Sequence, residues 1–215
     1  MTTSIQTPRK VLIYDTETNK QILWGERNSN PLQPHIVQIA AALYDAETRK
    51  PQASLNMIVK PTDWDIDEET VDIHGITLAH ASQFGVDEEG ALTAFWTLWQ
   101  EADLRVAHSE SFDARIINIA LRRFATQAET DKWNAGAGFC TMQSSRKMCG
   151  LFDKAGRKNK APKLTEAYEH FMGVPMPNAH TAHGDVRGCA AVYWAILAGM
   201  EEEQKDEHGI GNMFD

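Results

Sequence analysis

Four acidic residues and one histidine have the types and spacing needed for metal-dependent chemistry, and the first two are Asp15 and Glu17. Successive side chains of a strand point to opposite faces, so these acids continue the face of Val11 and Ile13 in an expected strand. An ionised carboxylate in a hydrophobic stripe is costly unless positive charge lies against it. A divalent cation such as Mg²⁺, which prefers oxygen ligands, would hold both acids compactly. The alternative is a strand that ends in an exposed Asp-x-Glu turn, and this pair alone does not decide between the two.

Two further carboxylates lie on the core-facing stripes of expected helices. Asp113 heads such a stripe in a helix that Ser109 or Ser111 would cap. The apolar residues that follow it at helical spacing are Ile116, Ile117, Ala120, Leu121 and Phe124. Asp185 shares its stripe with Gly188, Cys189, Val192 and Ile196. An acid in a first turn also interacts favourably with the helix dipole, so Asp113 taken alone has two explanations.

The four acids would repel one another if they all face the same core. Two divalent cations, about 3.5–4 Å apart, would remove this conflict and create a two-metal site for phosphoryl transfer. His180 precedes Asp185 by five positions and could take the proton of an attacking water. A lone histidine near a helix start is otherwise usually a cap or a surface residue.

Composition bounds the class of protein. The chain has 215 residues, enough for one α/β domain, which we expect at 10–200 between an N-terminal arm (1–9) and an acidic C-terminal tail (201–215). No apolar run is as long as a membrane span, so no membrane contact is expected. The three cysteines lack metal-ligand spacing and fit a reducing cytoplasm, and a bacterial or phage-encoded protein is plausible. A net charge of −9 argues against a general DNA-coating protein.

The elements that must position the acids begin with strands and continue mainly with helices. The expected strands are 11–18, 36–44, 55–60, 104–107 and 139–142. Short polar turns between the first three predict antiparallel pairing. Besides the helix that begins near Ser109, the expected helices are 67–80, stopped near Gly75, then 87–102, 164–171 and 181–200. Residues 19–35 read as a loop with a short hairpin strand at 22–24, which either lines a substrate groove or packs under the loop.

The basic segment 146–163 has a positive net charge, although the chain as a whole is acidic. It holds seven lysines and arginines against the single acid Asp153. One interpretation is a mobile loop that binds phosphates, with Lys158 and Lys160 as candidate contacts. The alternative is a solvated surface loop.

Three stretches, in order, resemble the exonuclease motifs of the DnaQ-like superfamily. They are Asp15-Thr16-Glu17-Thr18, then Ala107-His108-Ser109-Glu110-Ser111-Phe112-Asp113, then His180-Thr181-Ala182-His183-Gly184-Asp185. His74-Gly75-Ile76-Thr77 also looks like a phrase of that family. The resemblance spans roughly residues 10–198 and is to the four-acid-plus-histidine (DEDDh) subclass of 3′→5′ exonucleases. It implies an α/β, RNase H-like fold, a five-stranded mixed sheet flanked by helices on both faces.

The resemblance also implies roles for individual residues. Asp15, Glu17 and Asp185 look like ligands of one Mg²⁺ or Mn²⁺ ion, Asp15 like the bridge to a second, and Asp113 like the support of that second ion, with His180 as general base. Further candidates for substrate contact are Thr16, Thr18, His108, Ser111 and Phe112. Ser109 stands where asparagine is common, and His183-Gly184 replaces a more usual apolar-acidic pair, which bears on substrate preference. A histidine at position 180 disfavours the subclass that uses tyrosine as the base.

The expected reaction is hydrolysis at the 3′ end of a nucleic acid, with release of nucleoside 5′-monophosphates and a preference for single-stranded DNA. One alternative is a 3′→5′ exoribonuclease or oligoribonuclease of the same fold. Another is a non-catalytic nucleic-acid-binding module. A third is a proofreading subunit that a polymerase or another replication or repair partner holds through the tail, with Asn212-Met213-Phe214 as a docking peptide.

Overall fold

A mixed five-stranded sheet forms the centre of the computed structural model, which describes residues 8–177 and 181–210, with side chains as far as residue 200. The strands are β1 (Lys10–Thr18), β2 (Ile36–Asp45), β3 (Pro51–Ile58), β4 (Leu104–Ala107) and β5 (Gly138–Cys140). Their order is β3-β2-β1-β4-β5, with β1, β2 and β3 antiparallel and β1, β4 and β5 parallel. The predicted fold class is therefore confirmed.

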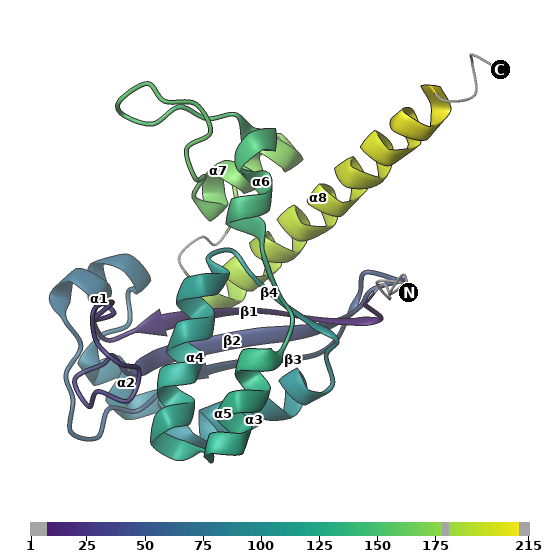
Figure 1. Ribbon diagram of the computed structural model, residues 1–215. Coiled ribbons are helices and arrows are strands. Elements are labelled where there is room, and N and C mark those ends of the chain that lie inside the picture. Colours follow the sequence, from purple (N-terminus) through teal and green to yellow (C-terminus); the bar gives the residue numbers. More distant parts are fainter. Residues whose placement is uncertain (1–7, 178–180, 211–215) are drawn as a thin grey trace.

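Helices cover both faces of this sheet (Figure 1). They are α1 (Glu68–His74), α2 (Leu78–Phe84), α3 (Glu88–Gln100), α4 (Glu110–Phe124), α5 (Gln127–Ala135), α6 (Thr141–Cys149), α7 (Leu164–Met172) and α8 (Ala182–Ile210). Residues of α3, α4 and α5 pack on one face, and α8 packs on the other.

The central strand β1 is buried on both faces, which explains its continuous apolar start. Leu12 and Tyr14 belong to the core under α3 and α4, whereas Val11 and Ile13 belong to the core under α8. All four side chains are fully buried. The alternation that the sequence predicts is therefore present, and it assigns positions 15 and 17 to the α8 face.

The helix expected at 67–80 is two helices instead of one. Gly75 ends α1 in the left-handed conformation, with φ of 74°, which favours glycine at a helix end. Thr77 then caps α2, since its hydroxyl accepts a hydrogen bond from the backbone nitrogen of His80 at 3.2 Å.

Several predicted boundaries were wrong. Residues 22–24 form no strand, and β3 covers 51–58 rather than 55–60. The strand predicted at 139–142 is only Gly138–Cys140, because Thr141 and Met142 already belong to α6. Neither α6 nor α5 was predicted from the sequence. The last helix does not end at residue 200 but continues to Ile210. Glutamate, glutamine and lysine at 201–205 are good helix formers, which explains the extension.

The ends of the chain bear on two other expectations. Residues 1–7 and 211–215, which hold most of the expected arm and the proposed docking peptide, lie outside the described residues. Within the described ranges, no helix combines the length and the apolar character that a membrane span requires.

Candidate active site

Three carboxylates from β1 and α8 meet near the C-terminal end of the central strand β1. Oxygen atoms of Asp15, Glu17 and Asp185 all lie within 4.8 Å of one another. The two β1 residues reach this point because they continue the face that α8 covers. Asp185 reaches it because Ala182 and Val186 on either side of it pack into the core beneath α8. The structure therefore brings together three acids that are up to 170 positions apart in the chain (185 − 15).

The fourth acid, Asp113, lies in the first turn of α4 and is 3% exposed. Strand β4 runs parallel to β1, so the start of α4 lies beside the end of β1. The backbone nitrogen and the hydroxyl of Thr16 both donate to Oδ1 of Asp113, at 3.0 and 2.8 Å. The Asp113 carboxylate is thereby held beside the strand that carries Asp15 and Glu17.

All four acids line one cavity of about 190 Å³. The residues around it are Asp15, Thr16, Glu17, His108, Ser109, Phe112, Asp113, Lys163, Leu164, Thr165 and Asp185. We did not single out the start of α7, from Lys163 to Thr165, as part of a site. The only feature of the sequence that could have pointed to this part of the site is that Lys163 is the last cation of the basic segment.

Burial and mutual repulsion raise the pKa values of the acids in the cluster. Burial, and then the charges of Asp113, Glu17 and Asp185, raise the pKa of Asp15 well above its usual value. Burial, and then Asp185 and Asp113, raise the pKa of Glu17 to about 8. Burial raises the pKa of Asp113 to about 7, although the hydrogen bonds from Thr16 act against it.

This donor set fits divalent cations. Carboxylate oxygens are the ligands that Mg²⁺ and Mn²⁺ prefer, and three of these acids offer oxygens around one point. The raised pKa values of Asp15 and Glu17 show that the ionised cluster is unfavourable without a positive counter-charge. A bound cation would supply that charge.

His108 joins the cavity wall to the segment that precedes α7. Its Nε2 lies 3.0 Å from the carbonyl oxygen of Pro162, and its Nδ1 lies 2.9 Å from Oγ1 of Thr141. A carbonyl only accepts, so Nε2 carries the hydrogen, and in the neutral ring Nδ1 accepts from the Thr141 hydroxyl. Burial lowers the pKa of His108, which favours this neutral form. We expected His108 to contact substrate, yet both ring nitrogens are engaged within the protein.

The other predicted substrate contacts divide into two groups. Thr16 and Phe112 line the cavity. Thr18, Ser111 and Lys158 do not: the Thr18 hydroxyl donates to the carbonyl oxygen of Lys20 at 3.0 Å, and Ser111 and Lys158 are exposed outside the cavity lining. Lys160, also outside the lining, forms an ion pair with Glu166, with Nζ 2.6 Å from Oε1.

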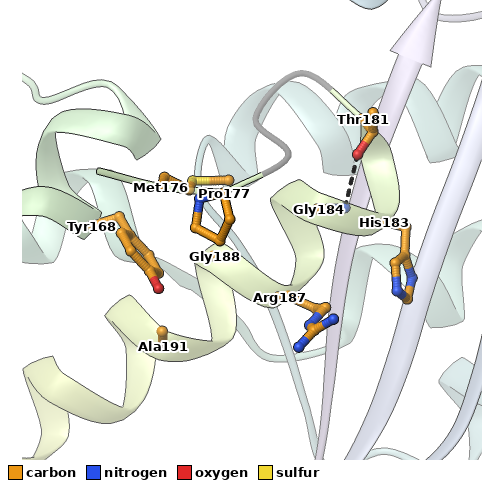
Figure 2. Close-up of a pocket in the computed structure, with 9 residues that line it drawn as sticks. All are labelled: Tyr168, Met176, Pro177, Thr181, His183, Gly184, Arg187, Gly188 and Ala191. Atoms are coloured by element: carbon orange, nitrogen blue, oxygen red, sulfur yellow. Dashed lines mark hydrogen bonds between the residues drawn. The ribbon is translucent and has the colours of Figure 1, made fainter. Parts of the chain in front are cut away.

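The predicted base, His180, lies outside the described residues. The chain is described again from Thr181, whose hydroxyl accepts a hydrogen bond from the backbone nitrogen of Gly184 at 3.1 Å and caps the first turn of α8. Figure 2 shows this bond beside a larger cavity, of about 640 Å³, between α7 and α8. None of the predicted site residues lines that cavity, so its size does not mark it as the active site.

A family of known proteins accounts for most of the chain. The model of the exonuclease family, RNase_T, matches residues 12–193. No curated protein matches the chain at a significant level.

Solved structures of exonuclease I share the fold. The E. coli protein in complex with a dT13 oligonucleotide aligns with a TM-score of 0.67 and 18% identity, over 93% of this chain and 43% of that chain. Exonuclease I from Methylocaldum szegediense aligns with a TM-score of 0.65 and 20% identity, over 87% of this chain and 40% of that chain. This chain therefore spans less than half the length of either structure, and the likeness at this identity shows the RNase H-like fold.

Proposed function

This chain belongs to the exonuclease family, and on that premise we propose that it hydrolyses phosphodiester bonds at the 3′ ends of nucleic acid and releases nucleoside 5′-monophosphates. The observation that carries the proposal is the meeting of Asp15, Glu17 and Asp185 within 4.8 Å, with Asp113 on the wall of the same cavity. A module that only binds nucleic acid has no need of such an unfavourable cluster.

Each acid has a proposed part in holding the cations. Asp15, Glu17 and Asp185 would hold one Mg²⁺ or Mn²⁺ ion, and Asp15 and Asp113 would hold a second. Two such ions, when bound, would supply a nucleophile from water and stabilisation of the negative charge on the leaving oxygen. Thr16 holds the Asp113 carboxylate in place through its two hydrogen bonds. His180 takes the proton of the attacking water as the general base.

The proposed substrate is a single strand that enters by its 3′ end, with DNA preferred. The four acids line a cavity of about 190 Å³, and the proposed occupant of this cavity is the terminal phosphodiester of such a strand. Thr16 and Phe112 on its wall are the proposed contacts of the terminal nucleotide. The exonuclease I structure with a bound dT13 oligonucleotide supports a nucleic-acid substrate for this fold.

A digestion series tests the reaction. Single-stranded DNA, duplex DNA and single-stranded RNA, each labelled at the 5′ end, are incubated with Mg²⁺, with Mn²⁺ or with EDTA. We expect a ladder of strands shortened from the 3′ end and free mononucleotides, with Mg²⁺ or Mn²⁺ only, and no ladder with Asp15→Ala. Ladders on RNA alone would make the protein an exoribonuclease. The absence of metal-dependent release from all three substrates would refute the proposal.

Association with a polymerase or another replication or repair protein is a separate proposal about the C-terminal residues 201–215. A pull-down with the full chain and with a chain that ends at Met200 tests it. Recovery of the partner by both chains would exclude this segment as the contact.

A further inference from the structure

Phe152 is an exposed aromatic residue in the basic segment. Its side chain is 64% exposed, the highest value among the large hydrophobic residues whose side chains the structure describes. It lies in the connection between α6 and α7, which Figure 1 shows as a green loop that projects clear of both helices. Single exposed hydrophobic residues are common on protein surfaces, so the case for Phe152 depends on the shape and charge of the hairpin that carries it.

The connection is a hairpin with a defined shape. Phe152 and Lys158 form an antiparallel bridge, and the backbone nitrogen of Asp153 donates to the carbonyl oxygen of Arg157 at 3.0 Å. The Asp153 carboxylate also accepts hydrogen bonds from the backbone nitrogen and Nε of Arg157, at 2.8 and 2.6 Å. Gly156 closes the tip with φ of 74°, a conformation that favours glycine. The hairpin therefore presents Phe152 on an ordered surface.

The base of the hairpin is attached to the wall of the carboxylate cavity. Nε of Arg146, on α6, donates to the carbonyl oxygen of Asn159 at 3.1 Å. The carbonyl oxygen of Pro162 accepts from His108, and the next residue, Lys163, lines the cavity itself. A strand that leaves the cavity along this wall would therefore pass the hairpin.

Charge and geometry together favour a nucleic-acid strand as the ligand. Arg157 is paired with Asp153 and Lys160 with Glu166, whereas Lys154 and Lys158 are exposed and have no ion pair among the described residues. Side chains of bridge partners lie on the same face of a two-stranded pair, so Lys158 and Phe152 share a face. An aromatic ring beside cations is the combination on which single-stranded nucleic acids bind, since bases stack and phosphates pair.

We propose that Phe152 stacks on a base of the bound strand, on the 5′ side of the terminal nucleotide, while Lys154 and Lys158 contact the phosphates around that base. This inference rests on the proposed function, because it needs a strand whose 3′ end occupies the carboxylate cavity. Every base has a stacking face, so the contact holds the strand without reading its sequence. Phe152 is not among the residues that line the cavity, so only strands long enough to leave it gain from the contact.

Binding measured against strand length tests the inference. Fluorescently labelled single strands of different lengths are titrated with the full-length protein in EDTA, where no strand is cut, and anisotropy gives the affinity. We expect Phe152→Ala to weaken binding of long strands by about 5- to 10-fold, the low end of the range for a base–aromatic stack, and to leave the shortest strands unaffected. Phe152→Trp should retain the affinity, and Phe152→Leu should lose it as alanine does. Phe84→Ala, at an aromatic residue that is 61% exposed on α2, is the matched control.

The outcomes separate this inference from the proposed reaction. Equal affinity of Phe152→Ala and the wild type at every length, or a full recovery by leucine, would overturn the stacking role alone. An equal loss at all lengths would also overturn it, because the contact would then not depend on a strand that leaves the cavity. If the wild type binds strands but releases no nucleotide, only the proposed reaction fails. The dependence of affinity on strand length then still tests whether Phe152 stacks on a base.

Discussion

Thr16 and Asp113 are 97 positions apart, yet the backbone nitrogen and the hydroxyl of Thr16 both donate to Oδ1 of Asp113, at 3.0 and 2.8 Å. The pair joins the end of β1 to the first turn of α4. Because both donors converge on Oδ1, the position of this Asp113 oxygen is set by the strand that also carries Asp15 and Glu17. The first two acidic motifs are thus linked directly.

Removing the Thr16 hydroxyl tests that link. Thr16→Val keeps the shape and the backbone bond but loses one of the two hydrogen bonds, which should lower the free energy of unfolding by about 1 kcal/mol. Because Asp113 is then held less firmly, nucleotide release should slow by about 10- to 100-fold, as for other residues that orient a metal ligand. Thr16→Ser keeps the hydroxyl and should stay near the wild type. Equal rates for valine and wild type would show that the hydroxyl is dispensable.

Replacing a carboxylate of the cluster should separate activity from stability. Asp15→Asn and Asp113→Ala each remove a proposed cation ligand and should lower the rate at least about 1,000-fold, or about 4 kcal/mol of activation free energy. In the metal-free protein, Asp15→Asn should raise the melting temperature, because it removes an acid whose ionisation is disfavoured by burial and by the neighbouring acids. Circular dichroism checks the fold. Metal-dependent cleavage that survives either change would refute the site.

The pKa of Glu17 predicts how metal-free stability depends on pH. Burial and the neighbouring acids raise this pKa from 4.5 to about 8, so between these values the folded chain holds a proton that the unfolded chain releases. The stability that Glu17 contributes is fully present below pH 4.5 and is lost as the pH rises toward about 8. In EDTA, the melting temperature of the wild type should therefore fall relative to Glu17→Gln across this window.

Two controls accompany the pH series. Glu47→Gln, at an exposed turn position, should follow the wild type. Added Mg²⁺ should reduce the fall, because a cation neutralises the repulsion between the acids. A difference between the wild type and Glu17→Gln that grows toward low pH would contradict the sign of the shift.

The general base is tested with two histidines close in sequence. His180→Ala should slow hydrolysis by about 100- to 10,000-fold, the usual contribution of a positioned base, while cation binding measured by calorimetry is kept. His183→Ala is the control, since His183 lines the cavity between α7 and α8 and not the carboxylate cavity. An unchanged rate for His180→Ala would remove this residue from the proposed role.

The two predicted phosphate contacts should differ from each other. Lys158 is exposed without an ion pair among the described residues, whereas Lys160 is paired with Glu166. Lys158→Ala should weaken binding of all sequences and lower the slope of log affinity against log salt by about 1. Lys160→Ala should lower this slope less. Lys50 lies in the exposed turn between β2 and β3, and Lys50→Ala should leave the slope unchanged. Equal slopes for Lys158→Ala and Lys50→Ala would make the segment an ordinary surface.

The sequence by itself determined the family, the fold class and the faces of the elements. Alternation along β1 placed Asp15 and Glu17 on the α8 side, and helical spacing placed Asp113 on the buried side of α4. These predictions succeeded because periodicity is a local property that burial imposes on each element separately. Local patterns failed at the apolar residues 22–24, which form no strand, and at the end of α8, where favourable helix formers follow residue 200.

Only the tertiary structure decided which groups meet. The distance between Asp15 and Asp185, the double hydrogen bond from Thr16 to Asp113 and the use of both His108 nitrogens join residues that are far apart in the chain. The first depends on α8 packing against β1, and the second on β4 lying parallel beside β1. Such neighbour relations arise from the packing of the whole chain, because burial fixes the side of an element that faces inward but not the element that lies against it.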